Sequence, residues 1–265
     1  MKLLFWNVHR NININDILAQ AILETNADII GLAEYNDIII NDLLHKLNAT
    51  DNPYYAFPFL GCKRINIISK INSHLCKPLF QCSYYSIWNF PYRETERINI
   101  AFVHFPICYL KEYDKIDIVD ELREVVENCE KETKCINSLI VGDYNMNPFE
   151  KQIYAGNGLN ATPVSSIARK SSRNVRNKER LFFYNPMWNL LGDFNSPSGS
   201  YYKYESGVEC LFWNLFDQVC IRPSLIDSFK QDQLKYLTQI NKINLLKNSI
   251  PDVEISDHLP LFFEL

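Results

Sequence analysis

The sequence predicts a layered α/β protein that folds as one domain. Its first 34 residues read as strand, helix and strand, which is the order of a βαβ unit. Closely spaced apolar strands follow, and such a run indicates an antiparallel meander. Several of these strands end at a polar or charged residue, where open α/β sheets bind their ligands. No linker, repeat or low-complexity tract interrupts the chain, so we expect a single domain over residues 1–265.

The composition is that of a soluble globular protein. Hydrophobic residues make up 47% and charged residues 22% of the chain, which argues against disorder. The net charge is −4, whereas proteins that bind nucleic acid over a broad surface are usually basic. Any polyanion is therefore expected to be bound locally or through a metal ion. No apolar run approaches the ~20 residues that cross a bilayer, and the N-terminus lacks the apolar core of a signal peptide. We expect a cytoplasmic protein with no membrane partner.

The eight cysteines form no CxxC pair. Neither a zinc ribbon nor a thioredoxin-type redox pair is indicated. Without export, free and mostly buried thiols are the expected state.

Apolar runs define the elements of the amino-terminal half. Helices are expected at Ile14–Thr25, where apolar residues recur at helical spacing behind Asn13 or Asn15 as a cap, and at Asp37–Leu47. Strands are expected at Lys2–Val8, Asp28–Ala33, Tyr55–Leu60, Ile65–Ser69, Tyr84–Phe90 and Ile98–Phe105.

The carboxy-terminal half is less regular. Ile116–Lys131 reads as a charged amphipathic helix and Leu139–Gly142 as a buried strand. Residues 147–200 carry clusters of Asn, Gly, Ser and Pro, which predict mostly loop with short elements. Strands return at Phe216–Ile221 and Leu259–Leu265.

Polar residues recur at the ends of the apolar strands. They are Asn7, Glu34, His104, Asp143, Asn145, Asp217, Asp257 and His258. Each alone has a plainer account as a turn former, a helix cap or a rim histidine. Together, carboxylates and imidazoles gathered at strand ends would repel or desolvate one another without a shared ligand. A hard divalent cation such as Mg²⁺ is the ligand that clustered carboxylates favour.

The motifs that hold these residues occur in a familiar order: FWNV, GLAE, VHF, GDYNMNP, FDQV and SDHLPLFFEL. In this the chain resembles the endonuclease/exonuclease/phosphatase superfamily, which includes pancreatic-type deoxyribonucleases, abasic endonucleases, neutral sphingomyelinases and inositol polyphosphate 5-phosphatases. The resemblance runs from residue 5 to residue 265. It implies a four-layer α/β/β/α sandwich of two packed mixed, largely antiparallel sheets, with the site at one mouth of the sheets.

The resemblance also implies a metal and a base. Glu34 would hold Mg²⁺ directly, and Asp257 would be a second or water-mediated contact. Mn²⁺ would substitute for Mg²⁺. Asp143 would orient or deprotonate the attacking water. Asn7 and Asn145 would fix water, metal ligand and phosphate oxygens, so Asn7 belongs to both the catalytic and the metal-binding sets.

Three further residues are assigned to the phosphate by the same resemblance. His258 would contact the scissile phosphate, and Asp217 would fix the tautomer and charge of its imidazole. His104 would be a second phosphate contact or proton donor. The residue types suit the chemistry independently, because phosphodiester cleavage requires neutralised oxygens, an activated water and an assisted leaving group.

The sequence departs from the family pattern at two places. His9 stands where abasic endonucleases commonly carry another acid, so that acidic ligand is missing. Lys63 and Arg64 replace small residues before the strand at Ile65–Ser69. These two cations are expected either to touch phosphate or to belong to a solvated face.

The segment Arg169–Arg180 carries six basic residues and one acid. It is either a solvated loop or a flexible arm that binds a nucleic-acid backbone through Arg173, Arg176 and Arg180, and the acidic rest of the chain favours the arm. Many aromatic residues follow. Most are expected in the core, and a few near the mouth are candidates for stacking on bases.

The leading hypothesis is a metal-dependent nuclease that hydrolyses DNA or RNA phosphodiester bonds by Asp-activated water attack, with nucleic acid as its partner. The alternative is a phosphatase or phosphodiesterase that acts on a small-molecule or lipid-head-group phosphoester. An inactive nucleic-acid-binding module is a weaker third possibility.

Overall fold

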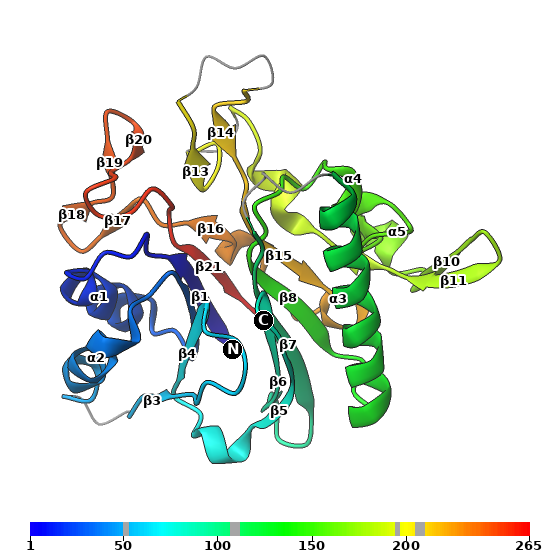
Figure 1. Ribbon diagram of the computed structural model, residues 1–265, viewed down its shortest axis with the longest axis horizontal. Helices are drawn as coiled ribbons and strands as arrows, with labels where there is room; N and C mark the ends of the chain where they lie inside the picture. Colours follow the sequence, from blue (N-terminus) through cyan, green and yellow to red (C-terminus); the bar gives the residue numbers. More distant parts are fainter. Residues whose placement is uncertain (50–52, 107–111, 194–196, 205–209) are drawn as a thin grey trace.

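The computed structural model describes residues 1–49, 53–106, 112–193, 197–204 and 210–265. Two β-sheets pack face to face, and helices cover their outer faces (Figure 1). This is the predicted α/β sandwich of two mixed sheets. None of the helices in these ranges is both long and apolar enough to cross a membrane.

The first sheet has six strands in the order β16-β21-β1-β2-β4-β3. Its strands are β1 (Lys2–Asn7), β2 (Ile29–Ala33), β3 (Tyr55–Ala56), β4 (Ile65–Ser69), β16 (Lys235–Tyr236) and β21 (Leu261–Glu264). Only β1 and β2 pair in parallel, and α1 (Asn15–Thr25) connects them. Both strands are continuous apolar runs because this part of the sheet is covered on both faces.

The second sheet has seven strands in the order β5-β6-β7-β8-β15-β12-β9. Its strands are β5 (Lys77–Gln81), β6 (Tyr85–Pro91), β7 (Arg97–His104), β8 (Ser138–Asp143), β9 (Ala161–Thr162), β12 (Phe183–Tyr184) and β15 (Asp217–Ile221). β7 and β8 pair in parallel, and the long helix α3 (Glu112–Thr133) crosses between them. β15 then pairs antiparallel with β8.

Two hydrophobic clusters hold the layers together. The larger one fills the space between the sheets and under α1 and α2 (Ile40–Leu47). The smaller one joins α3, through Val119, Leu122 and Val126, to the outer face of the second sheet. The sheets approach closely at Gly31, where an added Cβ would lie 2.6 Å from the ring of Phe102.

Short elements complete the chain. They are η1 (Asp37–Ile39), η2 (Ser73–Leu75), α4 (Lys151–Tyr154), α5 (Ser165–Ala168), β10 (Ser172–Val175), β11 (Lys178–Leu181), η3 (Pro186–Leu190), β13 (Tyr201–Tyr202), β14 (Trp213–Asn214), η4 (Pro223–Leu225), η5 (Gln231–Gln233), β17 (Gln239–Ile240), β18 (Ile243–Asn244), β19 (Leu246–Lys247) and β20 (Ile250–Pro251). The scarcity of regular structure in residues 147–200 is confirmed.

Some local expectations were wrong. No Asn side chain caps α1: Ile14 holds the cap position, and the Asn15 amide donates instead to Asp42 and to the carbonyl of Ile39. The strand expected at Tyr55–Leu60 is only two residues long. The edge strand β5 was not predicted, because its residues are mostly exposed and carry no apolar run.

Arg169–Arg180 contains regular secondary structure. Its central part forms the hairpin β10–β11, in which Arg173 is the cross-strand partner of Arg180. The turn residues Arg176 and Asn177 have φ of 51° and 62°, as a two-residue hairpin turn requires. The seven cysteines in the described part of the chain are all free, as expected, and four are buried.

Candidate active site

The site lies where the ends of both sheets meet. Parallel pairing places the carboxyl ends of β1 and β2 at one edge of the first sheet, and those of β7 and β8 at one edge of the second. β15 and β21 run antiparallel to their neighbours, so their amino ends lie at the same edges. The predicted polar residues therefore converge. The bond from Asn7 to Asp143, at 3.0 Å, links one sheet to the other.

Gly142 allows the chain to deliver Asp143. It pairs with Val103 in the parallel β7–β8 ladder, and its φ is 153°. A Cβ at this position would lie 2.0 Å from the carbonyl oxygen of Val103. Only glycine fits such a close approach of two backbones, and the next residue then enters the site.

The Asp143 carboxylate is the centre of the site. It is 1% exposed. Its Oδ2 accepts from the amide of Asn7 at 3.0 Å and from the amide of Asn145 at 3.3 Å. The same oxygen lies 3.8 Å from Nε2 of His104 and 4.0 Å from Nε2 of His258. These two distances are too long for direct hydrogen bonds.

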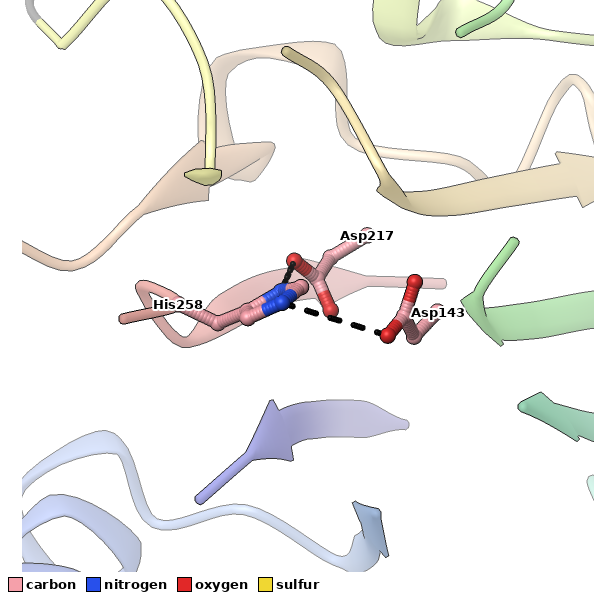
Figure 2. A group of neighbouring side chains, drawn as sticks. All are labelled: Asp143, Asp217 and His258. Atoms are coloured by element: carbon pink, nitrogen blue, oxygen red, sulfur yellow. Dashed lines mark hydrogen bonds and ion pairs between the residues drawn. The ribbon is translucent and has the colours of Figure 1, made fainter. Parts of the chain in front are cut away.

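Asp217 and His258 form a buried pair. Nδ1 of His258 lies 2.7 Å from Oδ2 of Asp217, and Figure 2 shows the far side of the ring facing Asp143. Burial opposes charge on the imidazole, but the carboxylates of Asp217 and Asp143 raise the pKa of His258 to about 10. Burial also raises the pKa of Asp217, and the nearby ring of His258 limits that rise. The geometry is that of an imidazole whose orientation and charge are set by its acid.

Four residues that the sequence did not single out hold this pair in place. Ser200 Oγ accepts from the Asp217 N–H at 3.1 Å, and the Tyr236 hydroxyl donates to the Asp217 carbonyl at 2.7 Å. Trp6 Nε1 donates to the His258 carbonyl at 2.8 Å, and the His258 N–H donates to Ser256 Oγ. Trp6 and Ser256 had a sequence signal, because they lie in the FWNV and SDH motifs.

His104 is a second buried imidazole beside Asp143. Its Nε2 lies 3.7 Å from Oε1 of Glu34 and 3.8 Å from Asp143. Its Nδ1 is buried and has no hydrogen-bond partner within the described ranges. The ring is held through its backbone, since its N–H donates to the carbonyl of Tyr84 at 2.9 Å. It thus stands between the predicted metal carboxylate and the predicted base.

A basic side chain lies beside each of the two predicted metal carboxylates. Nε of Arg10 lies 3.2 Å from Oε2 of Glu34, and Nδ1 of His9 lies 3.2 Å from Oδ1 of Asp257. Glu34, His9 and Arg10 all have left-handed backbones, with φ of 51°, 48° and 55°. Such conformations are costly for these residue types and concentrate at functional sites.

A divalent metal fits this part of the site. Asp257 Oδ1 is buried and, among the described residues, accepts no hydrogen bond of good geometry, although Nδ1 of His9 lies 3.2 Å away. Asn7 Oδ1 accepts one bond, from the His9 N–H, and keeps a second lone pair. Oxygen donors with unused lone pairs are what Mg²⁺ requires.

Another set of possible ligands lies beside it. One ligand atom each from Asp143, Asp217 and His258 lies within 4.8 Å of the other two. Part of this set is already used, because Nδ1 of His258 pairs with Asp217 and Asp143 accepts from two amides. Asp217 Oδ1, however, has no hydrogen-bond partner among the described residues, so both sets offer oxygen atoms to a cation.

The basic residues that are predicted to bind substrate lie in two separate parts of the structure. Lys63 and Arg64 are exposed and directly precede β4. Ile65 pairs with Ala33, the residue before Glu34, so both cations lie at the mouth of the site. The guanidinium of Arg64 lies 5.3 Å from the centre of the Tyr84 ring. The backbone carbonyl of Tyr84 accepts the hydrogen bond from the His104 N–H.

The basic hairpin is not brought to the site. In Figure 1, β10–β11 extends away from the sheets, well separated from the ends of β1, β8 and β15. Arg173 is also occupied, since its guanidinium donates to Asn160 at 2.5 Å and to the Tyr154 carbonyl at 3.3 Å. Arg176 and Arg180 lie on the same projecting hairpin. Contact of these three arginines with substrate therefore stays a prediction, for a part of the substrate away from the scissile bond.

Comparison with solved structures identifies the fold. An endonuclease/exonuclease/phosphatase family protein from Leptotrichia buccalis aligns over 100% of this chain and 98% of its own, with 16% identity and a TM-score of 0.58. The chain has the endonuclease/exonuclease/phosphatase fold. The mannosyl-6-phosphatase Bt3783 of Bacteroides thetaiotaomicron aligns over 100% of this chain and 98% of its own, at 12% identity and a TM-score of 0.58. D. rerio TDP2 complexed with a single-strand DNA product aligns over 99% and 97%, at 14% identity and a TM-score of 0.57.

At these identities the likeness establishes the fold alone. No family model matches the sequence, and no curated protein matches it. Structural neighbours with this fold include the endonuclease domain of TRAS1, a mannosyl-6-phosphatase and TDP2 with a single-strand DNA product. The chemistry of this chain therefore has to be argued from its own residues.

Proposed function

We propose that the protein is a metal-dependent phosphodiesterase that cleaves nucleic acid. The observation that carries the proposal is the surrounding of Asp143 Oδ2, with two amides in contact and two imidazole nitrogens at 3.8 and 4.0 Å. A carboxylate held in this way can accept a proton from water, while the two nearby rings can contact phosphate oxygens. The predicted catalytic residues thus lie in one cluster.

Asp143 is assigned the role of general base. The amides of Asn7 and Asn145 hold its carboxylate in one orientation. The Asn145 N–H also donates to Oδ1 at 2.8 Å, and the Asn145 amide is fixed by the Phe105 carbonyl at 2.9 Å. A base held by such bonds does not need to reorient when the reaction begins, which is the condition for efficient proton transfer.

His258 and His104 are assigned to the phosphate. The Asp217 carboxylate on Nδ1 leaves Nε2 of His258 as the donor that faces Asp143. His104 supplies a second Nε2 near the same carboxylate oxygen. Two donors at the attack site would stabilise the charge that develops on the phosphoryl oxygens.

Glu34, Asp257 and Asn7 are the residues that would hold Mg²⁺ or Mn²⁺. When bound, the metal supplies Lewis-acid stabilisation of phosphoryl charge. Arg10 and His9 pair with two of these residues, and Lys63 and Arg64 are placed to contact phosphate beside the mouth.

A nucleic-acid substrate is favoured by the structural neighbours TDP2, with its single-strand DNA product, and the TRAS1 endonuclease domain. The second candidate is a phosphatase or phosphodiesterase for a small phosphoester. One observation favours it: the basic hairpin lies away from the site, so the described mouth has few cations with which to follow a long polyanion.

A substrate panel tests the proposal. Labelled single- and double-stranded DNA and RNA and small phosphoesters are incubated with and without Mg²⁺, using wild-type protein and Asp143→Asn. We expect metal-dependent cleavage of nucleic acid and a loss of at least ~10²-fold in Asp143→Asn, the lower range for a general base. Cleavage that survives complete chelation, or a near-wild-type Asp143→Asn, would contradict the metal-and-base mechanism. Turnover of small phosphoesters alone would establish the second candidate.

A further inference from the structure

The hairpin β13–β14 is built directly onto the Asp217–His258 pair. Ser200, which precedes β13, accepts from the Asp217 N–H through its hydroxyl and from the Leu259 N–H through its carbonyl. Tyr201 forms a β-bridge with His258, and their ring centres lie 4.7 Å apart. The hairpin is therefore continuous with the catalytic pair through both backbone and side chains.

Beyond Tyr201 the hairpin carries a cluster of aromatic rings. The ring of Tyr202 lies 5.4 Å from that of Trp213 and 6.2 Å from that of Phe212. These rings are not fully used in packing among themselves, because Phe212 remains 46% exposed. Tyr204, on the same hairpin, is 86% exposed. We call Tyr202, Tyr204, Phe212 and Trp213 the aromatic platform.

The backbone at Phe212 is also unusual. Its φ is 62°, a conformation that large side chains seldom adopt. The Lys203 N–H donates to the Phe212 carbonyl at 2.8 Å, and the Asn214 amide donates to the same oxygen at 3.1 Å. The structure thus holds an exposed phenyl ring on a strained backbone, and strain of this kind is typical of ligand-contacting positions.

The platform begins one position beyond Tyr201, the residue that bridges His258. In the hairpin register Tyr201 pairs with Asn214 and Tyr202 with Trp213, and Phe212 follows at the next position. Two steps along a strand span ~7 Å. The backbone of Tyr202 therefore lies one step, and that of Phe212 about two steps, from the Tyr201–His258 bridge.

We propose that the aromatic platform stacks on unpaired nucleobases beside the scissile phosphate and so selects single-stranded nucleic acid. This rests on the proposed function and specifies its substrate. Stacking on a protein ring requires a base with a free face, which a strand end or a single strand offers and the interior of a duplex does not. Stacking also depends less on charge than backbone binding does, which suits a chain of net charge −4.

The test measures binding in an Asp143→Asn background, so that bound strands stay intact. Phe212→Asn removes the ring and installs a residue type that tolerates the left-handed backbone. Phe80→Asn is the matched control: Phe80 is 36% exposed on the edge strand β5, four strands from β15 in the sheet order. Tyr204→Ala is a second platform variant that removes a side chain exposed to solvent. The probes are a fluorescent ten-nucleotide dA strand, an abasic strand of equal length and a ten-base-pair duplex.

We expect Phe212→Asn to weaken binding of the dA strand at least ~5-fold, the lower value for one base–aromatic stack. Binding of the abasic strand and of the duplex should change less than twofold, and Phe80→Asn should match the parent on every probe. Equal losses of affinity for the dA and abasic strands would overturn the platform. Unchanged affinity for the dA strand in both Phe212→Asn and Tyr204→Ala would overturn it as well.

Two further outcomes separate the possible failures. If the parent binds no strand and the wild-type protein hydrolyses only small phosphoesters, the proposed function and the platform both fail. If strands are cleaved but the platform variants change only the binding of vesicles of phosphatidylcholine and phosphatidylserine, the nuclease stands and the hairpin is a lipid-contacting surface.

Discussion

Replacing Asp217 and His258 singly and together tests whether they act as one unit. Nδ1 of His258 lies 2.7 Å from Oδ2 of Asp217, and both side chains are buried. Among the described residues, the imidazole is the only cation-forming group within 4.0 Å of the Asp217 carboxylate. If the acid acts only through the ring, its replacement should have no effect once the ring is gone.

The expected losses of kcat follow from the roles proposed for Asp217 and His258. A positioned acid or base contributes about 10²–10⁴-fold. We expect Asp217→Asn to lower kcat about 10²-fold and His258→Ala about 10³-fold, while the double variant stays near 10³-fold because members of one catalytic unit are not additive. Independent roles would instead give about 10⁵-fold, the product of the two penalties.

The assay is turnover at saturating metal on the best substrate of the panel, with folding checked by circular dichroism. Tyr236→Phe is the matched control, because its hydroxyl donates to the Asp217 carbonyl and not to the carboxylate. It loses one buried hydrogen bond, worth ~1 kcal/mol of stability, and should keep activity. Multiplying penalties in the double variant would refute the coupling. If Tyr236→Phe lowered kcat as much as Asp217→Asn does, the effect of Asp217→Asn would be attributed to a change in structure.

Three other predictions concern charges. Arg10→Ala should tighten Mn²⁺ binding about two- to fivefold in calorimetry, because it removes a partly solvated competitor for Glu34 worth up to ~1 kcal/mol; unchanged affinity would contradict this. Glu130→Ala should lower the free energy of unfolding by about 3–5 kcal/mol, since it leaves the buried Arg222 unpaired. Urea denaturation measures that loss, and adding Arg222→Met should restore most of it. Alanine at Arg173, Arg176 and Arg180 should flatten the salt dependence of long-strand binding without changing cleavage of a short strand, and an unchanged slope would leave the hairpin without a role in binding.

The layered fold was predictable because its central strands are buried on both faces. β1, β2 and β8 are continuous apolar runs that each end at or beside a polar residue. Such a run indicates a strand that is buried on both faces, and the polar residue at its end marks the site. The edge strand β5 escaped prediction because its side chains are mostly exposed and its formation depends on pairing with β6.

The residues that hold the site were harder to find than the residues that form it. Ser200 and Tyr236 bind the backbone of Asp217 from segments distant in sequence. Neither ends an apolar run, so no local pattern marks them. Arg10 contacts Glu34 only because the turn after β1 takes two left-handed residues in succession, a geometry that local propensity does not favour.

The basic segment shows the limit of charge as a guide to location. Six cations in a chain of net charge −4 indicated a substrate contact, yet charge patterning carries no information about which end of a sheet a loop occupies. Register does. Lys63 and Arg64 looked weaker in sequence, but pairing of Ile65 with Ala33 fixes them next to Glu34.

The site depends on the packing between the sheets as much as on its own residues. The first sheet provides Asn7 and Glu34, and the second provides His104 and Asp143. The Asn7–Asp143 hydrogen bond and the His104–Glu34 approach both cross the gap between the sheets. The contact at Gly31 sets how closely the sheets approach each other. Because a packed core resists deformation, the relative positions of base, imidazoles and metal carboxylates are fixed by apolar side chains that take no part in the chemistry.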